Sequence, residues 1–313
     1  MKFERSRLTQ HSRVGWMFAL TWTCLALGAA VWAEAARNHE VPLLVAPEWL
    51  RDHLSDKALI VVDTRSEADY SKGHIPGSVC MDASGLSATT SDEGLRLLKE
   101  DLASRFAPLG ISGEEIVVFY EDGIGVRAPR ALWYYTYAGY RTGRVLAGGF
   151  RTWQNSHFPV SQERSLRPSR PLVVKANSQV IASTDFVAHR LNDSGVVLLD
   201  VRSFDEYVGK EGNGQTARSG HIPGARWLEW GRLLEGNLRY LPKNDLERKL
   251  AQVGVTPDKE VIVYCQRGNR ASNTFLALQL LGFPRVRNYV GSWQEWSSHL
   301  DLPLSTGEST SGR

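Results

Sequence analysis

The stretch Val261-Ile262-Val263-Tyr264-Cys265-Gln266-Arg267-Gly268-Asn269-Arg270-Ala271-Ser272-Asn273-Thr274 decides the fold. Its first four residues are apolar and β-favouring, which predicts a strand that is buried on both faces and ends at Cys265. A polar, cationic turn follows, and from Ala271 the sequence favours a helix that stops at Gly282 and Pro284. Cys265 is therefore expected at the C-terminal end of a strand, directly before a helix N-terminus.

The expected surroundings of Cys265 favour a thiolate over a thiol. Backbone N–H groups of the turn and the positive end of the helix point toward the strand end. Arg267 and Arg270 add two positive charges close in sequence. The alternative is a buried, inert cysteine, but two arginines and a glycine are poor neighbours for a core thiol. Cys265 is predicted to be a nucleophile.

The sequence contains the same pattern twice. A buried strand ending in Asp-x-Arg and a later Gly-His-Ile-Pro-Gly turn occur at 59–65 and 73–77, and again at 196–202 and 220–224. Further along, 115–120 matches 260–264, and 148–154 matches 290–296. Strands that alternate with helical patterns predict an α/β fold of two tandem domains, each a mostly parallel sheet flanked by helices. The domains are expected at 42–160 and 172–308, joined by a linker, 161–171, that is rich in Ser, Arg and Pro.

The first copy serves as a control for the second. Where the second copy has Cys265, the first has Glu121-Asp122-Gly123-Ile124-Gly125, which contains no sulfur nucleophile and is acidic. A carboxylate at this place would repel an anionic substrate and cannot carry a sulfur atom. The first domain is predicted to be catalytically silent.

The loop from Cys265 to Arg270, together with the repeated motifs, resembles the active-site loop of the rhodanese (sulfurtransferase) family. The resemblance covers roughly residues 42–308 and implies two tandem rhodanese-like domains, the first an inactive copy. It implies that Cys265 is the nucleophile and carries a sulfane sulfur as a persulfide. It also implies that the loop binds substrate and cradles the outer sulfur through its N–H groups, with the residues Gln266, Arg267, Gly268, Asn269 and Arg270.

The expected reaction moves a sulfane sulfur from a small anionic donor to cyanide, a small thiol or a protein thiol, in two steps through Cys265. Thiosulfate is the favoured donor because Arg267 and Arg270 suit a dianion. Cysteine-dependent phosphatases are a second hypothesis, but their loops have five residues between Cys and Arg, whereas Arg270 follows Cys265 after four. A third is a sulfur-carrier or redox-sensing module of the cell envelope that does not turn over.

No cofactor or metal is expected, since no Cys, His and carboxylate residues have the spacing of zinc ligands. Nucleic acid is not an expected partner, because much of the basic excess lies in the first 13 residues of a chain with a net charge of +3.

Two further arginines are candidate substrate contacts. Arg202 ends an Asp-x-Arg strand, and it either contacts the donor anion or holds the loop. Arg218 lies in an insertion, 208–219, that the first copy lacks, so it is either part of a solvated loop or an anion contact at the edge of the site.

The Asp-x-Arg acids and the turn histidines have a structural interpretation. Asp63 with Arg65, and Asp200, occur in both copies, including the silent one, which favours a structural ion pair or turn cap over catalysis. His74 and His221 are also repeated, so a hydrogen-bonded turn histidine is favoured over a Cys–His dyad.

The N-terminus predicts export. Basic residues from Lys2 to Arg13 precede the uncharged run Val14–Ala33, which is followed by small residues up to Ala35. Residues 1–35 are thus expected to be a signal peptide, cleaved near Ala33 or Ala35, or a membrane anchor at 14–33, with the domains in the periplasm.

Cysteine usage indicates no disulfide framework. Of three cysteines, only Cys80 and Cys265 lie outside the leader. Cys80 is interpreted as a core residue of a short strand, with a regulatory pairing to Cys265 as the alternative.

Overall fold

The computed structural model describes residues 41–86, 88–210, 216–236 and 239–307. The expected leader, 1–35, and its possible anchor, 14–33, lie outside these residues, as does 211–215 of the insertion. Within the described residues, no helix is both long and apolar enough to cross a membrane.

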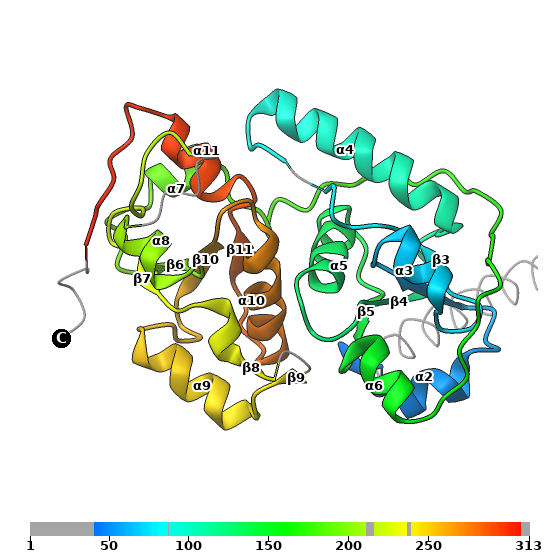
Figure 1. Cartoon of the computed structure of the whole chain (residues 1–313). Helices are drawn as coiled ribbons and strands as arrows, with labels where there is room; N and C mark the ends of the chain where they lie inside the picture. Colours follow the sequence, from blue (N-terminus) through cyan, green and yellow to red (C-terminus); the bar gives the residue numbers. More distant parts are fainter. Residues whose placement is uncertain (1–40, 87, 211–215, 237–238, 308–313) are drawn as a thin grey trace, which may run out of the picture. The chain divides into compact units, whose positions relative to one another are not determined.

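The first domain is built on a five-stranded parallel sheet (Figure 1). The strand order is β1-β5-β4-β2-β3, and every neighbouring pair runs parallel. The strands are β1 (Leu44–Val45), β2 (Leu59–Asp63), β3 (Val79–Cys80), β4 (Ile116–Tyr120) and β5 (Gly143–Leu146). The central strand β4 leads into the acidic loop at Glu121.

The second domain repeats this order. Its sheet runs β11-β10-β6-β7, again all parallel, with β6 (Val196–Asp200), β7 (Arg226–Trp227), β10 (Glu260–Tyr264) and β11 (Val286–Asn288). A parallel bridge from Ile181 to Asn288 takes the place that β1 has beside β5. A separate hairpin joins β8 (Leu234–Glu235) and β9 (Arg239–Tyr240). The expected pair of parallel α/β domains is confirmed.

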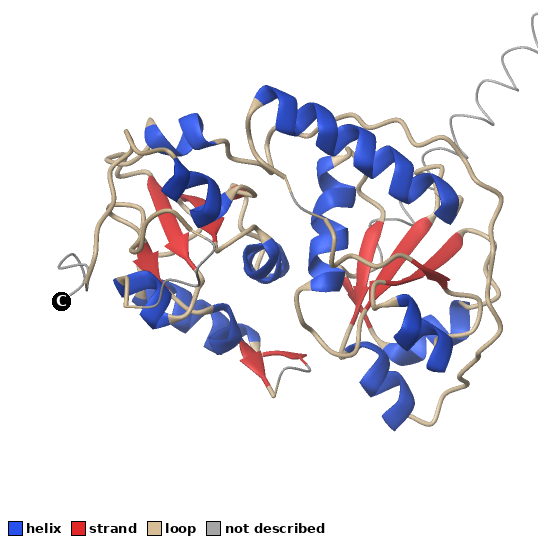
Figure 2. Cartoon of the chain, turned by 45° about the horizontal axis from the view of Figure 1, so that its top comes forward, coloured by secondary structure: helices blue, strands red, loops and turns tan. Residues whose placement is uncertain are grey.

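Helices cover both faces of the sheets (Figure 2). In the first domain they are α2 (Pro47–His53), α3 (Glu67–Lys72), α4 (Asp92–Phe106), α5 (Arg127–Tyr137) and α6 (Gly149–Asn155), with the 3₁₀ turn η1 (Ala107–Leu109). In the second they are α7 (Thr184–Ala188), α8 (Phe204–Val208), α9 (Lys243–Gln252), α10 (Asn269–Leu280) and α11 (Ser292–Ser298), with η2 (Trp230–Leu233).

The apolar run that precedes Cys265 is buried on both faces, as expected. Val261 and Val263 belong to a hydrophobic cluster that includes side chains of α9 and α10. Ile262 and Tyr264 point the other way, into a cluster with side chains of α7, α8 and α11. Successive side chains of a strand alternate between faces, so a strand covered on both sides must be apolar throughout.

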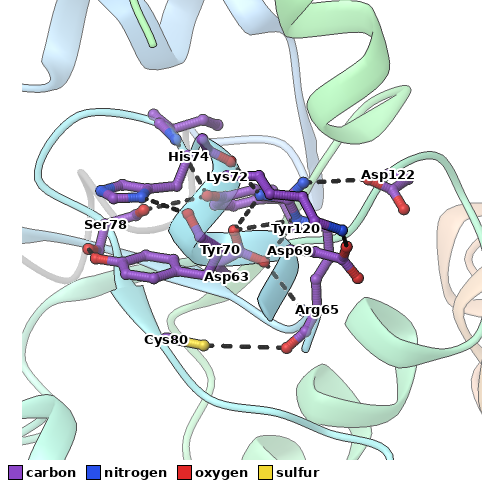
Figure 3. Close-up of polar contacts among 12 residues, drawn as sticks. Asp63, Arg65, Asp69, Tyr70, Lys72, His74, Ser78, Cys80, Tyr120 and Asp122 are labelled. Carbon is purple, nitrogen blue, oxygen red and sulfur yellow. Dashed lines mark hydrogen bonds and ion pairs between the residues drawn. The ribbon is translucent and has the colours of Figure 1, made fainter. Parts of the chain in front are cut away.

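A buried Asp–Arg pair closes the same turn in each domain. In the first, Arg65 bonds Asp63 at 2.6 Å and the carbonyl oxygen of Gly73 at 2.8 Å (Figure 3). In the second, Arg202 bonds Asp200 at 2.5 Å and the carbonyl of Gly220 at 2.7 Å. The pair therefore ties the end of a central strand to the Gly-His-Ile-Pro-Gly turn.

The expected linker packs along the first domain. Ser161 pairs with His74 through two backbone hydrogen bonds of 2.9 Å, and the Arg170 N–H donates to Ala107. Similar bonds continue past residue 171, because the N–H groups of Lys175 and Asn177 donate to the end of α5. The segment is a strap held by backbone hydrogen bonds.

The buried pair should dominate the stability of its domain. Asp200→Ala leaves Arg202 as a buried cation without its carboxylate, which typically costs about 3–5 kcal/mol. Equilibrium urea unfolding should show this loss. The control is Glu247→Ala, which removes an exposed partner of Lys243 and should cost at most about 1 kcal/mol. Equal losses in the two variants would contradict the structural importance of the pair.

Candidate functional site

Cys265 lies directly after β10 and is 1% exposed. The turn Gln266–Gly268 separates it from α10, which begins at Asn269, two residues before the helix expected from the sequence. Gly268 has a left-handed φ of 79°, and a Cβ there would lie 2.8 Å from the carbonyl oxygen of Val290. Only glycine fits this turn without strain. The expected strand, turn and helix around Cys265 are thus all present.

A serine outside the loop fixes its shape. The Ser292 hydroxyl accepts the N–H groups of Cys265 at 3.1 Å and Gly268 at 2.9 Å, and donates to the carbonyl of Tyr289 at 2.7 Å. Ser292 itself has a left-handed φ of 56°. The N–H of Gly268, one of the loop residues predicted to bind substrate, is thus bound to Ser292 in this structure.

The silent domain shows what this geometry binds. Glu121 follows β4 as Cys265 follows β10, because Tyr120 and Tyr264 pair with the equivalent residues Asp63 and Asp200. The Glu121 carboxylate accepts the N–H groups of Arg127 at 2.9 Å and Ala128 at 3.0 Å. Burial raises the pKa of Glu121, and these N–H groups oppose the rise. The first turn of α5 thus binds a carboxyl group, at the place where α10 faces a sulfur atom.

Arg270 is held by a carboxylate from another helix. Its guanidinium makes two bonds to Glu206, at 2.6 and 2.9 Å, and Glu206 also closes the capping box of Ser203 at the start of α8. Burial would raise the pKa of Glu206, but the hydrogen bonds and charge of Arg270 outweigh it and lower the pKa to about 2. Arg270 is close enough to Cys265 for the two to interact electrostatically.

The structure gives Arg202 and Arg218 structural positions. Arg202 is 1% exposed and bonded to Asp200 and Gly220 in the same way as Arg65 in the silent copy. Burial would lower the Arg202 pKa, but Asp200 outweighs it and the pKa is raised. Of the two roles considered for Arg202, holding the turn is the one that these contacts support.

Arg218, predicted to be either part of a solvated loop or an anion contact, binds backbone carbonyls. Its guanidinium caps α11 and the chain after it, with bonds to the carbonyl oxygens of Ser297 (3.0 Å), Leu302 (2.8 Å) and His299 (2.6 Å). A cation at a helix C-terminus satisfies carbonyls that have no partner within the helix. Nothing in the sequence of the insertion indicated these partners.

Two loop side chains carry buried polar atoms that are unused. Within the described part of the chain, Gln266 Nε2 and Asn269 Oδ1 are buried without a hydrogen-bond partner. Buried polar groups are normally paired, so each indicates a substrate or water that is bound during the reaction. A cavity of about 400 Å³ opens beside the loop, with Arg267, Gly291 and Gln294 on one side and Thr89 of the first domain on the other.

A hydrogen bond between the domains borders this cavity. Glu295, which lines the cavity, accepts the backbone N–H of Thr90 at 2.8 Å and its hydroxyl at 2.9 Å. Burial raises the pKa of Glu295, and the bonds from Thr90 oppose the rise. Both domains therefore form the walls beside the loop.

The two turn histidines contact tyrosines of their own domains, and Cys80 lies at the end of β3. His221 contacts the carbonyl of Tyr207 at 2.8 Å and stacks on its ring at 3.9 Å, and His74 makes the equivalent contacts with Tyr70. Cys80 is a free, half-buried thiol at the end of β3. Burial, with Glu67 beside it, raises the pKa of Cys80 to about 12.

Sequence reasoning missed three residues of the site. Ser203-x-x-Glu206 is a capping-box pattern, so the position of Glu206 was open to prediction. Ser292 was missed because the sequence comparison aligned the two copies incorrectly by one residue. It matched 148–154 with 290–296, whereas the structure aligns Gly148-Gly149 with Gly291-Ser292. The N–H groups of Phe150 and Trp293 show this register by binding the carbonyls of Glu121 and Cys265.

The third missed residue is Arg130 of the silent domain. It is 4% exposed and lies close enough to Cys265 to interact with it electrostatically. No pattern in one copy indicates this, because the proximity depends on how the domains pack.

Two segments, 46–156 and 183–299, match the Rhodanese-like domain family. The chain belongs to the rhodanese family. It is 34% identical over 265 residues to a thiosulfate sulfurtransferase of Azotobacter vinelandii, covering 84% of this chain and 97% of that one. A sulfur carrier protein of Thermus thermophilus is 31% identical over 283 residues, covering 85% of this chain and 97% of that one. The expectation of a sulfur-transfer enzyme is confirmed at this level.

The chain is also similar to solved structures. The anaerobic ergothioneine biosynthesis enzyme of Chlorobium limicola, in complex with trimethyl histidine, has a TM-score of 0.75 and 26% identity, covering 85% of this chain and 71% of that one. Another similar structure, with a TM-score of 0.75 and 27% identity over the same shares, carries a persulfide on its cysteine.

The hydroxyl of Ser292 should be needed for activity more than for folding. Ser292→Gly keeps the left-handed backbone, which Gly149 adopts in the silent copy, but leaves two buried N–H groups without their acceptor. Each such group costs about 1–3 kcal/mol, so the loop should shift and kcat/KM for thiosulfate should fall by about tenfold or more. The control is Ser183→Gly, which removes a similar hydroxyl that caps α7. Equal activity in both variants would show that Ser292 does not hold the loop.

Proposed function

We propose that the protein transfers a sulfane sulfur from thiosulfate to a thiophilic acceptor, with Cys265 as the sulfur carrier. The observation that carries this proposal is the position of Cys265 at the end of β10, under the first turn of α10. The silent copy places a carboxylate at the equivalent position, where it accepts two N–H groups. The same cradle stabilises the negative charge of a thiolate or persulfide.

The reaction has two displacement steps. In loading, the Cys265 thiolate attacks the outer sulfur of thiosulfate, the sulfur–sulfur bond of the donor breaks, and sulfite leaves with the electron pair. In discharge, cyanide or a thiolate attacks the outer sulfur of the persulfide. The product leaves as thiocyanate or a new persulfide, and the Cys265 thiolate is restored. Neither step needs a cofactor, metal or external oxidant.

The loop suits a donor of this charge. Arg267 lines the cavity and Arg270 lies near the sulfur, so a dianion that enters meets positive charge. Gln266 Nε2 and Asn269 Oδ1, two buried polar atoms of the loop without hydrogen-bond partners, are available to the donor or the leaving sulfite. The names of the relatives from Azotobacter vinelandii and Thermus thermophilus agree with sulfur transfer and with sulfur carriage.

The chemistry should depend on one cysteine. Cys265→Ser should abolish thiosulfate:cyanide activity and leave the fold intact, because a hydroxyl cannot form a persulfide. Cys80→Ser, the matched control, should keep most of the activity, because burial holds that thiol in its protonated form. Mass spectrometry after thiosulfate treatment should find one added sulfur on the Cys265 peptide. Full activity of the Cys265 variant would rule the proposal out.

We also infer that the domains act outside the cytoplasm. The basic segment from Lys2 to Arg13, the uncharged run Val14–Ala33 and the small residues near Ala35 support this. Cleavage near Ala33 or Ala35 would release the enzyme into the periplasm, whereas retention would anchor it through residues 14–33.

Export can be measured with a fusion. Residues 1–40 joined to a reporter that is active only after export should give reporter activity. The same fusion with Leu25→Arg and Leu27→Arg should not, because charges interrupt the apolar run. Sequencing the N-terminus of the mature protein separates cleavage from anchoring. Activity that is absent from both fusions would show that the segment is not an export signal.

A further inference from the structure

The helices that follow the two central loops pack against each other. α5 begins after the Glu121 loop and α10 after the Cys265 loop, and the two helices are in direct contact. Side chains of both lie in one hydrophobic cluster, which also includes residues of both sheets. The first turn of each helix can therefore contact the loop of its own domain. Residues of the second turn can contact the loop of the other domain.

α10 makes such a contact with the first domain. Asn273 donates its Nδ2 to the carbonyl of Gly125, in the silent loop, at 2.5 Å. Tyr240 supports this position by donating its hydroxyl to the Asn273 carbonyl at 2.8 Å. Asn273 is thus a residue of the second domain that is bound to the loop of the first.

Arg130 holds the equivalent position on α5. Arg127-Ala128 matches Arg270-Ala271 in the repeat, so Arg130 corresponds to Asn273. Arg130 is 4% exposed and interacts electrostatically with Cys265. The duplication therefore gives each loop one polar side chain from the other domain, an amide at the silent loop and a guanidinium at the active one.

Arg130 differs from the other buried arginines in what surrounds it. Arg65 and Arg202 each bind a buried aspartate, and Arg144 binds the carbonyls of Arg141 and Gly143. Among the described residues, no carboxylate forms an ion pair with Arg130. Burial lowers its pKa, and the groups that oppose this are Tyr134 and Cys265. The Arg130 guanidinium also lies over the Tyr134 ring, 5.8 Å from its centroid. A buried cation without a carboxylate partner costs several kcal/mol, and an anion that occupies the site during catalysis would offset this cost.

We propose that Arg130 is the counter-ion of the sulfur on Cys265, so that the silent domain supplies a cation to the active site. This inference rests on the proposed persulfide chemistry. Arg130 stabilises the thiolate before loading and attracts the anionic donor during loading. The first domain, which has Glu121 at the place of Cys265, is thereby part of the catalytic machinery.

Several charged groups lie near Cys265 in the described part of the chain. They include Arg267 in the same loop, Arg270, which is paired with Glu206, and Arg130. Near Arg130 they are Tyr134 on its own helix and Arg105 on α4, which is paired with Asp101. Removing the charge of Arg130 should therefore change the electrostatic environment mainly at the Cys265 sulfur.

The test replaces the cation in the full chain by an apolar side chain of similar length. In Arg130→Met, the pH midpoint of Cys265 alkylation by iodoacetamide should move up by about one unit or more, followed on the Cys265 peptide by mass spectrometry. The kcat/KM for thiosulfate should fall by about tenfold to a hundredfold, as expected for a lost charge-assisted contact. The melting temperature should stay the same or rise, because an unpaired buried charge has been removed.

The control is Arg144→Met, which removes a buried arginine whose partners are backbone carbonyls. It should lower the melting temperature and leave the alkylation midpoint unchanged. Arg130→Lys, which keeps the charge, should restore the midpoint in part. If Arg130→Met does not fold, Arg130→Gln should give the same upward shift.

An unchanged midpoint in the folded neutral variant would overturn the inference, whatever happens to its stability. Alkylation needs no turnover, so this failure is distinct from failure of the proposed function, which would instead appear as activity in Cys265→Ser.

Discussion

Both domains of this protein are organised by one constraint: a helix N-terminus faces the end of the central strand, so a hydrogen-bond acceptor must lie between them. The first turn of a helix has N–H groups without intrahelical partners. In one domain these groups bind the carboxylate of Glu121, and in the other they face Cys265. The parallel sheet satisfies this constraint, because its central strand ends at the edge of the sheet where the helix begins.

The duplication separates what the fold needs from what the chemistry needs. The Asp–Arg pair, the stacked histidine and the tie from the helix after the last strand recur in both copies, with nearly the same distances. These features belong to the scaffold. The nucleophile, the Ser292 hydroxyl and the Glu206–Arg270 pair belong to the second copy only. The first copy has Gly149 at the place of Ser292, with a similar left-handed φ. The backbone conformation therefore does not require the hydroxyl, which is an additional feature of the second copy.

The sequence was sufficient for the features that depend on local patterns. The strand before Cys265, the glycine turn, the helix after it and the silent copy all follow from periodicity and repetition. Arg202 and Arg218 could not be assigned in this way, because the partner of a long cationic side chain is set by tertiary structure. Arg218 reaches carbonyls about 80 residues away in the chain. The role of Ser292 could not be predicted for a different reason. An alignment error of one residue between the two copies gave the wrong equivalent residue, so the side chain that faces the loop could not be identified.

The remaining question is what the first domain, which has no cysteine at its strand end, contributes to the site, and the buried arginines indicate an answer. A buried cation is tolerated when its partner is fixed, as Asp200 is for Arg202. A buried cation is also tolerated when its partner is the reacting group. The negative charge of a thiolate, a persulfide or a bound donor then compensates the charge of the cation during the catalytic cycle. Arg130 fits the second case, because it is held on a helix that packs against α10 and is kept away from water. Within the second domain, Arg270 on α10 lies near Cys265 but is paired with Glu206. Arg130 comes from the first domain and has no carboxylate partner among the described residues, so the first domain contributes to the electrostatics of the site although it has no cysteine at its own strand end.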